Sequence, residues 1–368
     1  MFYLATSPDL YGPICRNIGA HALVTKDSRV VLEKPIGHDL ASAREITFSQ
    51  AVREALAEEM RRDPTVFIIG EDVAEAGTPF KVMLGLVDEF GPERVIDAPI
   101  SEPGFAGLGV GAAMTGMRPV VDIMFGDFLG LIMDQVANQA AKIHYMSGGK
   151  LKAPMVFRTT LGATRRAAAQ HSQSLQAWPS HIPGLKVVLP STPYDAKGLL
   201  KTAIRDDNPV VFIEDKLMHQ AKGNVPEGEY TLPFGVADIK RPGTDITLVA
   251  TSSMVQVALA AAERLASLGL SAEVIDPRTT VPLDRLALIE SAKKTAHVIV
   301  MDEGYESYGV TAELAAVIAD GAFYYLDAPV KRMGAMDVPV PFSPALEDLT
   351  VPTPDRVIEA AKALCGRA

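Results

Sequence analysis

A glutamate between a predicted strand and a predicted helix is the residue of this sequence best placed to do chemistry. Residues 95–100 (VIDAPI) form an extended apolar segment that turns at SEPG and continues into a helix of small residues, expected at 105–115. Glu102 therefore lies at the carboxyl end of a strand, where α/β sheets bind ligands and a helix amino terminus can orient a polar group. Because mainly apolar and small residues follow, its carboxyl group is a candidate for proton transfer. The alternative is a capping residue in the first helical turn.

The residues after Glu102 favour the chemical interpretation. Gly107, Leu108 and Gly111 follow it in the pattern E-x-x-x-x-G-Φ-x-x-G, in which Φ is apolar. This spacing resembles the glutamate signature of thiamine-diphosphate enzymes. From about residue 45 to the carboxyl end, ordered blocks narrow the resemblance to the β subunit of the decarboxylating component of 2-oxo acid dehydrogenase complexes: PISEPGFAGLGVGAA, RPVVDIMFGDF, DQVANQAAKIHYMSGG, AAQHSQS, HIPGLKVVLPSTPYDAKGLL and AIRDDNPVVF.

The resemblance implies an α/β fold with two parallel-sheet domains, a pyrimidine-binding thiamine-diphosphate domain followed by a transketolase-type C-terminal domain. Apolar runs typical of buried parallel strands agree with this, at 66–70, 119–124, 155–158, 185–190 and 210–214. Beyond them, strands predicted at 246–250, 272–275 and 297–300 alternate with helices predicted at 254–268, 283–292 and 309–319.

Four segments are expected along the chain. An N-terminal extension at 1–43 is either poorly ordered or holds a short strand at 29–32, and an upstream start codon taken in error would also explain it. The pyrimidine-binding domain is expected at 44–217, a linker rich in Pro and Gly at 218–242, and the C-terminal domain at 243–368.

The resemblance assigns cofactor roles to three residues. Glu102 would hydrogen-bond the aminopyrimidine ring and favour the tautomer that removes the thiazolium proton. Met124 and Phe128 match positions that wall the slot for this ring, and core packing explains both side chains equally well. Phe128 would stand at a turn into a long helix reaching residue 144. Glu71 and Asp72, after the strand at 66–70, form an acidic corner that in the family lies near the cofactor entrance. We interpret them as solvated loop carboxylates without a direct catalytic role.

His171 has the strongest claim to a catalytic role among the histidines. It lies in the small-residue stretch 163–174, where an imidazole has room to approach a substrate and titrates near neutral pH. It corresponds to the family's active-site histidine, which assists acyl transfer from the thiamine adduct to the lipoyl group. His181 is a weaker second candidate, and a structural role suits it better.

A potassium site is a further implication of the resemblance. The helix predicted after residue 192 ends near 204 in the polar run RDDN, whose oxygens and terminal carbonyls suit a hard monovalent cation. The alternative is a polar helix end without a metal. The positions that match the potassium ligands of some relatives are Met155, Ala203, Ile204, Asp206 and Asn208.

The sequence lacks the motif with which this class of enzyme holds the diphosphate and its magnesium ion, a Gly-Asp-Gly followed by paired asparagines. The glycines at 107, 109 and 111 also lack the dinucleotide-binding spacing. The resemblance therefore implies half a site, with an α subunit holding the diphosphate and magnesium in an α₂β₂ heterotetramer. A lipoyl-bearing acyltransferase core and a small 2-oxo acid are the other expected partners.

Composition narrows the class of protein. The chain has 368 residues, 48% of them apolar, and a net charge of −10, which argues against a nucleic-acid surface. No uncharged run approaches the ~20 residues of a membrane span. The two cysteines, Cys15 and Cys365, support neither a disulfide framework nor a cysteine metal site. We expect a soluble cytoplasmic protein.

Three hypotheses from different classes compete. The first is an oxidoreductase β subunit acting on a 2-oxo acid with a lipoyl-protein acceptor, of the pyruvate dehydrogenase type or, alternatively, of the acetoin or branched-chain type. The second is an independent transketolase-like enzyme, which the missing phosphate motif disfavours. The third is a noncatalytic scaffold subunit, against which the joint presence of Glu102, Phe128 and His171 argues.

Overall fold

The computed structural model describes residues 2–4, 30–32 and 43–367 of the chain, which divide into two units. The smaller unit contains the described residues up to 45 together with 224–229. In it, strand β1 (Phe2–Leu4) pairs in parallel with β2 (Val30–Leu32), so the strand predicted at 29–32 is confirmed over 30–32. The rest of the predicted N-terminal extension lies outside the described residues. A second two-stranded sheet is formed by β3 (Ala43–Thr47) and β10 (Lys222–Pro226).

The larger unit contains a seven-stranded sheet with the order β14-β8-β9-β7-β6-β4-β5. All neighbouring strands are parallel except β14, which runs antiparallel to β8. Helices cover both faces, which explains why the central strands are buried along most of their length and are mainly apolar. The strands are β4 (Val66–Gly70), β5 (Val95–Asp97), β6 (Arg118–Ile123), β7 (Val156–Leu161), β8 (Lys186–Val188), β9 (Val210–Asp215) and β14 (Thr279–Val281).

A separate hydrophobic cluster lies on each face of this sheet. Helix α2 (Phe48–Arg62), which begins with a capping box between Thr47 and Gln50, packs with α7 (Pro193–Arg205) on one face. Helix α4 (Glu102–Met114) and the π-helix η4 (Asp134–Ala140) cover the other face. The shorter helices of this unit are α3 (Leu86–Phe90), which packs in the α2 cluster, η3 (Gly126–Gly130), α5 (Ala141–Met146) and α6 (Ala177–Ser180).

Two helical predictions on this part of the chain need correction. Helix α4 begins at Glu102 itself, because Pro103 is tolerated in the first turn, where its missing N–H needs no partner. The single long helix predicted to reach residue 144 is instead a 3₁₀ turn, a π-helix and a short α-helix. In the π-helix the Asp134 carboxylate accepts hydrogen bonds from Asn138 (2.8 Å) and Gln139 (3.4 Å), a spacing that suits the wider turn.

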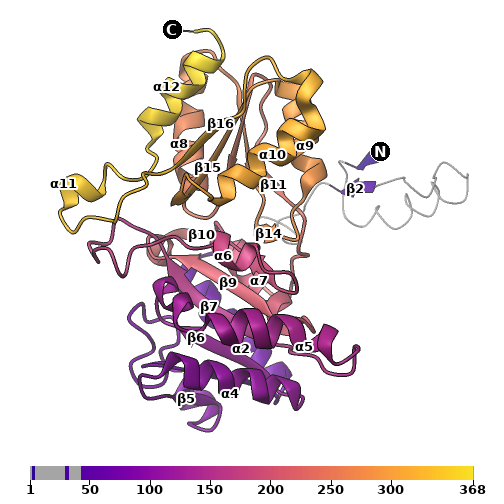
Figure 1. The fold of residues 1–368 in the computed structure, drawn as a ribbon, viewed down its shortest axis with the longest axis vertical. Coiled ribbons are helices and arrows are strands. Elements are labelled where there is room, and N and C mark those ends of the chain that lie inside the picture. Colours follow the sequence, from indigo (N-terminus) through magenta and orange to yellow (C-terminus); the bar gives the residue numbers. More distant parts are fainter. Residues whose placement is uncertain (1, 5–29, 33–42, 368) are drawn as a thin grey trace, which may run out of the picture. The chain divides into compact units, whose positions relative to one another are not determined.

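The second sheet of the larger unit has five strands in the order β11-β13-β12-β15-β16, parallel except for β11. Helices α9 and α10 pack together on one face, side by side in Figure 1, while α8 and α12 pack on the other. The elements are β11 (Asp238–Arg241), β12 (Ile246–Ala250), β13 (Ala272–Asp276), β15 (Val298–Tyr305), β16 (Lys331–Ala335), α8 (Met254–Ser267), α9 (Arg285–Thr295), α10 (Val310–Ala322), α11 (Pro344–Glu347) and α12 (Pro354–Leu364), with 3₁₀ turns η5 (Met218–Gln220) and η6 (Phe323–Tyr325).

The α/β class with two sheets of mainly parallel strands is confirmed, with an antiparallel strand in each as a refinement. The segment expected as a linker, 218–242, contains η5, β10 and β11, and the domain boundaries placed around it stay a prediction. Of the described residues, none belongs to a helix with the length and apolar character that crossing a membrane requires.

Candidate active site

The residues predicted for catalysis and cofactor binding follow strands at the carboxyl edge of the seven-stranded sheet. Glu102 follows β5, Glu71 follows β4, the segment 124–128 follows β6, and the segment holding His171 follows β7. These strands are neighbours in the order β7-β6-β4-β5 and run in parallel, so their carboxyl ends meet at one edge. This edge is where open α/β sheets bind ligands.

Glu102 is a buried carboxylate at the start of α4. Its side chain is 7% exposed, and the strand β5 and the turn at Ser101 fix its position. Within the described part of the chain, no group donates a hydrogen bond to this carboxylate and no cation pairs with it. A buried acceptor left in this state is available to a ligand that carries a donor.

Glu71 is a second buried carboxyl beside Glu102. Burial raises the pKa of Glu71, and the charge of Glu102 raises it further, so the two carboxyls lie close enough to repel. The backbone N–H of Ser101 donates to Glu71, whereas its Oε1 atom has no hydrogen-bond partner among the described residues. The interpretation of Glu71 as a solvated loop residue is therefore wrong, while its neighbour Asp72 is exposed as expected.

Phe128 and His171 are in contact. The His171 ring lies edge-on to Phe128, with centroids 5.4 Å apart, and edge-on to Phe125, with centroids 4.9 Å apart. Met124, one residue before Phe125, is partly buried, and its carbonyl accepts a 2.7 Å hydrogen bond from the Thr160 hydroxyl. Strand β4 separates β6 from β5, so Met124 and Phe128 are one strand removed from Glu102.

Lys216 is a residue of this edge that the sequence analysis did not identify. Its buried ammonium donates to the carbonyl oxygens of His171 and of Gly162 (3.1 Å) and lies 5.2 Å from the centroid of the Phe125 ring. Burial lowers the pKa of Lys216, and the nearby charge of Asp127 opposes that change. The feature of the sequence that could have identified Lys216 is its position directly after the strand at 210–215, at the predicted carboxyl edge of the sheet.

The five predicted potassium ligands lie together, and oxygens of Met155, Ala203, Ile204 and Asp206 already accept hydrogen bonds. Arg118 Nη1 donates to the carbonyls of Ile204 (3.0 Å) and Asp206 (2.9 Å), while the Asp206 carboxylate binds Lys186 and Asn208. The backbone carbonyls of Met155 and Ala203 accept N–H groups at 2.9 and 3.3 Å. In the described ranges, no cluster of three or more His, Cys, Asp or Glu side chains suits a metal ion.

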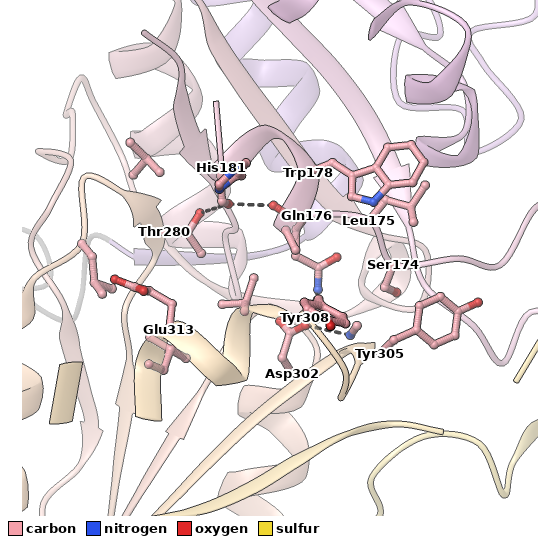
Figure 2. A pocket seen from close by; sticks show the side chains of 18 of the residues that line it. Ser174, Leu175, Gln176, Trp178, His181, Thr280, Asp302, Tyr305, Tyr308 and Glu313 are labelled. Carbon is pink, nitrogen blue, oxygen red and sulfur yellow. Dashed lines mark hydrogen bonds between the residues drawn. The ribbon is translucent and has the colours of Figure 1, made fainter. Parts of the chain in front are cut away.

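A pocket of about 910 Å³ is lined in part by residues between 174 and 182, which follow the His171 segment in the sequence (Figure 2). Its wall includes Trp178, Tyr305 and Tyr308, and Gln176 donates a 2.5 Å hydrogen bond to Asp302 inside it. By size it would be the default ligand site. Of the predicted residues only His181 lines it, whereas Glu102, Met124, Phe128 and His171 do not. Glu102 and His171, the residues with proton-active side chains predicted for catalysis, lie at the sheet edge and do not line this pocket.

Two known domain families match the two parts of the chain that, strand β14 apart, form the two large sheets. Residues 44–220 match the family described as "Transketolase, pyrimidine binding domain", and residues 235–357 match "Transketolase, C-terminal domain". Residues 1–61 also match "Glucose-6-phosphate dehydrogenase, NAD binding domain", a match that extends into helix α2. Most of the residues before 44 lie outside the described part of the chain.

Curated relatives are similar over most of their length. The chain is 50% identical to the acetoin:2,6-dichlorophenolindophenol oxidoreductase subunit beta of Bacillus subtilis, covering 88% of this chain and 98% of the relative. It is 49% identical to the pyruvate dehydrogenase E1 component subunit beta of Rickettsia felis, covering 87% and 98%. It is 46% identical to the mitochondrial pyruvate dehydrogenase E1 component subunit beta-1 of Oryza sativa subsp. japonica, covering 89% of this chain and 89% of the relative.

A solved structure entitled "Split gene transketolase, inactive beta4 tetramer" shares the fold, with a TM-score of 0.71 and 23% identity over 87% of this chain and 98% of that one. The two domain matches, their order and the extent of the curated relatives agree with one another. The chain belongs to the family of β subunits of thiamine-diphosphate-dependent 2-oxo acid dehydrogenases, which includes the E1 components of pyruvate dehydrogenase and the acetoin-oxidising enzymes.

Proposed function

We propose that this chain, assembled with an α subunit, is the β subunit of a 2-oxo acid dehydrogenase that decarboxylates its substrate and transfers the acyl group to a lipoyl group. The observation that supports this most directly is Glu102, a buried carboxylate at a ligand-binding sheet edge without a donor among the described residues. Such a group suits the ring nitrogen of an aminopyrimidine.

The residues at the sheet edge fit thiamine diphosphate. When bound, the cofactor supplies an electron sink for the carbanion left by decarboxylation. Glu102 would hold a proton at the pyrimidine ring nitrogen, and its 7% exposure excludes water from that hydrogen bond. Glu71, with its raised pKa and an unpartnered oxygen among the described residues, would keep the adjoining position polar.

The part of the site formed by Met124, Phe128 and His171 would serve cofactor binding and the acyl transfer that follows decarboxylation. Phe128 and Met124 offer a flat apolar ring and a soft thioether against which a heterocycle can lie. His171, in contact with Phe128, would donate or accept a proton during acyl transfer to the lipoyl group. Its edge-on packing against two phenylalanines limits the directions in which the imidazole can point.

A partner must complete the site. The sequence holds no motif for the diphosphate and magnesium, so we assign both to an α subunit in an α₂β₂ heterotetramer. The names of the relatives, "subunit beta", are consistent with such a division. The lipoyl-bearing acyltransferase core is the proposed acceptor of the acyl group.

Pyruvate is the proposed substrate, and acetoin is the second candidate. Relatives named as pyruvate dehydrogenase subunits are up to 49% identical, and the relative named as an acetoin oxidoreductase subunit is 50% identical. In the assembled enzyme the α partner would supply part of the surface that selects the substrate.

The experiment is copurification with an α subunit from the same organism, followed by assays with thiamine diphosphate, magnesium and each of pyruvate, acetoin and a branched-chain 2-oxo acid. We expect turnover by the assembled pair with one of these substrates and none by this chain alone. Thiamine-dependent turnover by the isolated chain would indicate an independent enzyme. Full activity of a complex carrying both Glu102→Gln and His171→Ala would indicate a scaffold.

A further inference from the structure

The segment that joins β7 to His171 has an unusual backbone. Thr164, Arg166 and Ala168 have φ angles of +65°, +59° and +61°, in the left-handed region that residues with a Cβ rarely occupy. Alternating positive φ angles of this kind persist only where the surroundings hold them. The position of His171 therefore depends on the groups that hold this segment, which we call the histidine loop (residues 162–171).

Glu347 makes the central contact with the histidine loop. Its side chain is fully buried at the end of α11, and its Oε1 accepts the backbone N–H of Thr164 at 2.7 Å. Its Oε2 accepts Arg166 Nη1 at 2.7 Å. One carboxylate thus fixes both a main-chain and a side-chain group at two of the positive-φ residues.

The neighbours of Glu347 reinforce this contact. Ala163 packs in a small hydrophobic cluster with Val340 and Val351, which flank α11. Exposed Asp348 also accepts hydrogen bonds from Arg166, at 2.7 and 3.1 Å, but among the described residues it forms no hydrogen bond with the loop backbone. Asp348 therefore offers a matched comparison, since it binds the same guanidinium without touching Thr164.

The ends of the loop are held separately. The backbone N–H of Ala163 donates to Glu303 Oε1 at 2.7 Å, and Lys216 donates to the carbonyls of Gly162 and His171. These contacts fix where the loop begins and ends. Glu347 fixes the path between them, so its removal should loosen the middle of the loop while the sheet edge with Glu102 stays intact.

We propose that Glu347 is a positioning residue for His171: by binding Thr164 and Arg166 it holds the histidine loop in the conformation that acyl transfer to the lipoyl group requires. The inference rests on the proposed function. Because Glu102 lies on a different strand end, Glu347 should affect acyl transfer and leave the earlier decarboxylation nearly unchanged.

The test compares two acceptors on the assembled α₂β₂ enzyme with saturating thiamine diphosphate. The dye 2,6-dichlorophenolindophenol reports substrate oxidation, and oxidised lipoamide reports acyl transfer. For Glu347→Ala we expect kcat with lipoamide to fall about tenfold or more, as displacement of a catalytic group does, with the dye rate within about twofold of the unmodified enzyme. Glu347→Gln keeps an acceptor for Thr164 and should lose less. Asp348→Ala should keep both rates.

Limited proteolysis gives a readout that does not depend on activity. Trypsin should cleave after Arg165 or Arg166 faster in Glu347→Ala than in Asp348→Ala. The two variants should have the same melting temperature, so that the difference reports the histidine loop and not global unfolding. Equal losses with both acceptors, or no loss in either glutamate variant, would overturn the inference. Absence of dye reduction by the unmodified enzyme would instead reject the proposed function, so the two failures are distinguishable.

Discussion

Arg158 in β7 donates two hydrogen bonds of 2.6 Å, from Nε and Nη2, to the two carboxylate oxygens of Glu214 in the adjacent strand β9. Its Nη1 pairs with Asp122 in β6, the strand on the other side. All three side chains are fully buried directly behind the carboxyl edge of the sheet. Burial raises the pKa of Asp122 and of Glu214, and the Arg158 guanidinium opposes this rise in both.

Arg158→Met should therefore destabilise the protein by about 3–5 kcal/mol, since it leaves two buried carboxylates without a cation. The loss should grow as the pH rises, because the folded state then holds protons that the unfolded state releases. Urea unfolding at pH 5.5 and 8 measures both effects. The triple variant Asp122→Asn, Arg158→Met, Glu214→Gln should recover part of the stability, and a triple variant no better than the single one would contradict this account.

Glu102→Gln should slow exchange of the thiazolium proton by about 10²–10⁴-fold in the assembled enzyme, the usual contribution of a positioned acid or base. Proton exchange followed by NMR on the cofactor-loaded heterotetramer measures it. Glu75→Gln, an exposed carboxylate after β4, is the control and should exchange normally. Near-normal exchange in Glu102→Gln would remove its proposed role.

His171→Ala should reduce lipoyl acylation by about 10²-fold or more while the affinity for thiamine diphosphate stays within a few-fold. His181→Ala provides the control, because His181 is exposed and lines the separate pocket of Figure 2. Cofactor affinity is measured by titration of activity and acylation by single turnover with oxidised lipoamide. Losses of equal size in affinity and acylation would exclude the acyl-transfer role.

His219 should make the protein sensitive to acid. Burial, together with the charges of Arg158 and Arg165, lowers the pKa of His219 to about 3; the ring stacks on Phe80 at 4.5 Å and contacts Ser49 Oγ through Nδ1 at 3.2 Å. Between pH 6.5 and about 3 the unfolded state binds a proton that the folded state does not, so stability falls as the pH falls.

Between pH 6.5 and 5, this effect amounts to about 2 kcal/mol. Unfolding free energies of His219→Phe should therefore fall less over this interval than those of the unmodified chain. His144→Gln, at an exposed histidine, should leave the slope unchanged. A parallel pH profile in His219→Phe would contradict the prediction.

Potassium should stabilise the end of α7 if the predicted ligands share their carbonyls with Arg118. At ten times its dissociation constant, a bound ion would add about 1.4 kcal/mol. We expect a higher melting temperature in KCl than in NaCl at equal ionic strength, and loss of that difference in Asn208→Ala. Identical melting temperatures of the unmodified protein in the two salts would reject the site.

The sequence predicted the elements whose pattern is local. The strands at 66–70 and 246–250 were placed with their observed bounds, because each is a short, mainly apolar run buried on both faces. The arrangement of strand ends that gathers Glu102, Phe128 and His171 also follows from the order of βα units, once the sheet is parallel.

Contacts between segments that are far apart in the chain could not be predicted from the sequence. Arg158 and its carboxylates are 36 and 56 residues apart, and Thr164 and Glu347 are 183 residues apart. The burial of Glu71 could not be predicted either, since a carboxylate after a strand is more often solvated. Strand β14 was missed because its three residues, between Pro277 and Pro282, give too short a pattern.

Strand β14 also bears on how the protein can be divided in the laboratory. The transketolase pyrimidine-binding match ends at residue 220, yet Thr279 and Val281 pair with Val188 and Val187 at the rim of the same sheet. A fragment cut at 220 would leave backbone N–H and C=O groups on the outer side of β8 without hydrogen-bond partners. An unpaired strand edge of this kind promotes self-association. A recombinant piece meant to fold alone must therefore extend past 281, so the sequence-defined module is shorter than the physical one.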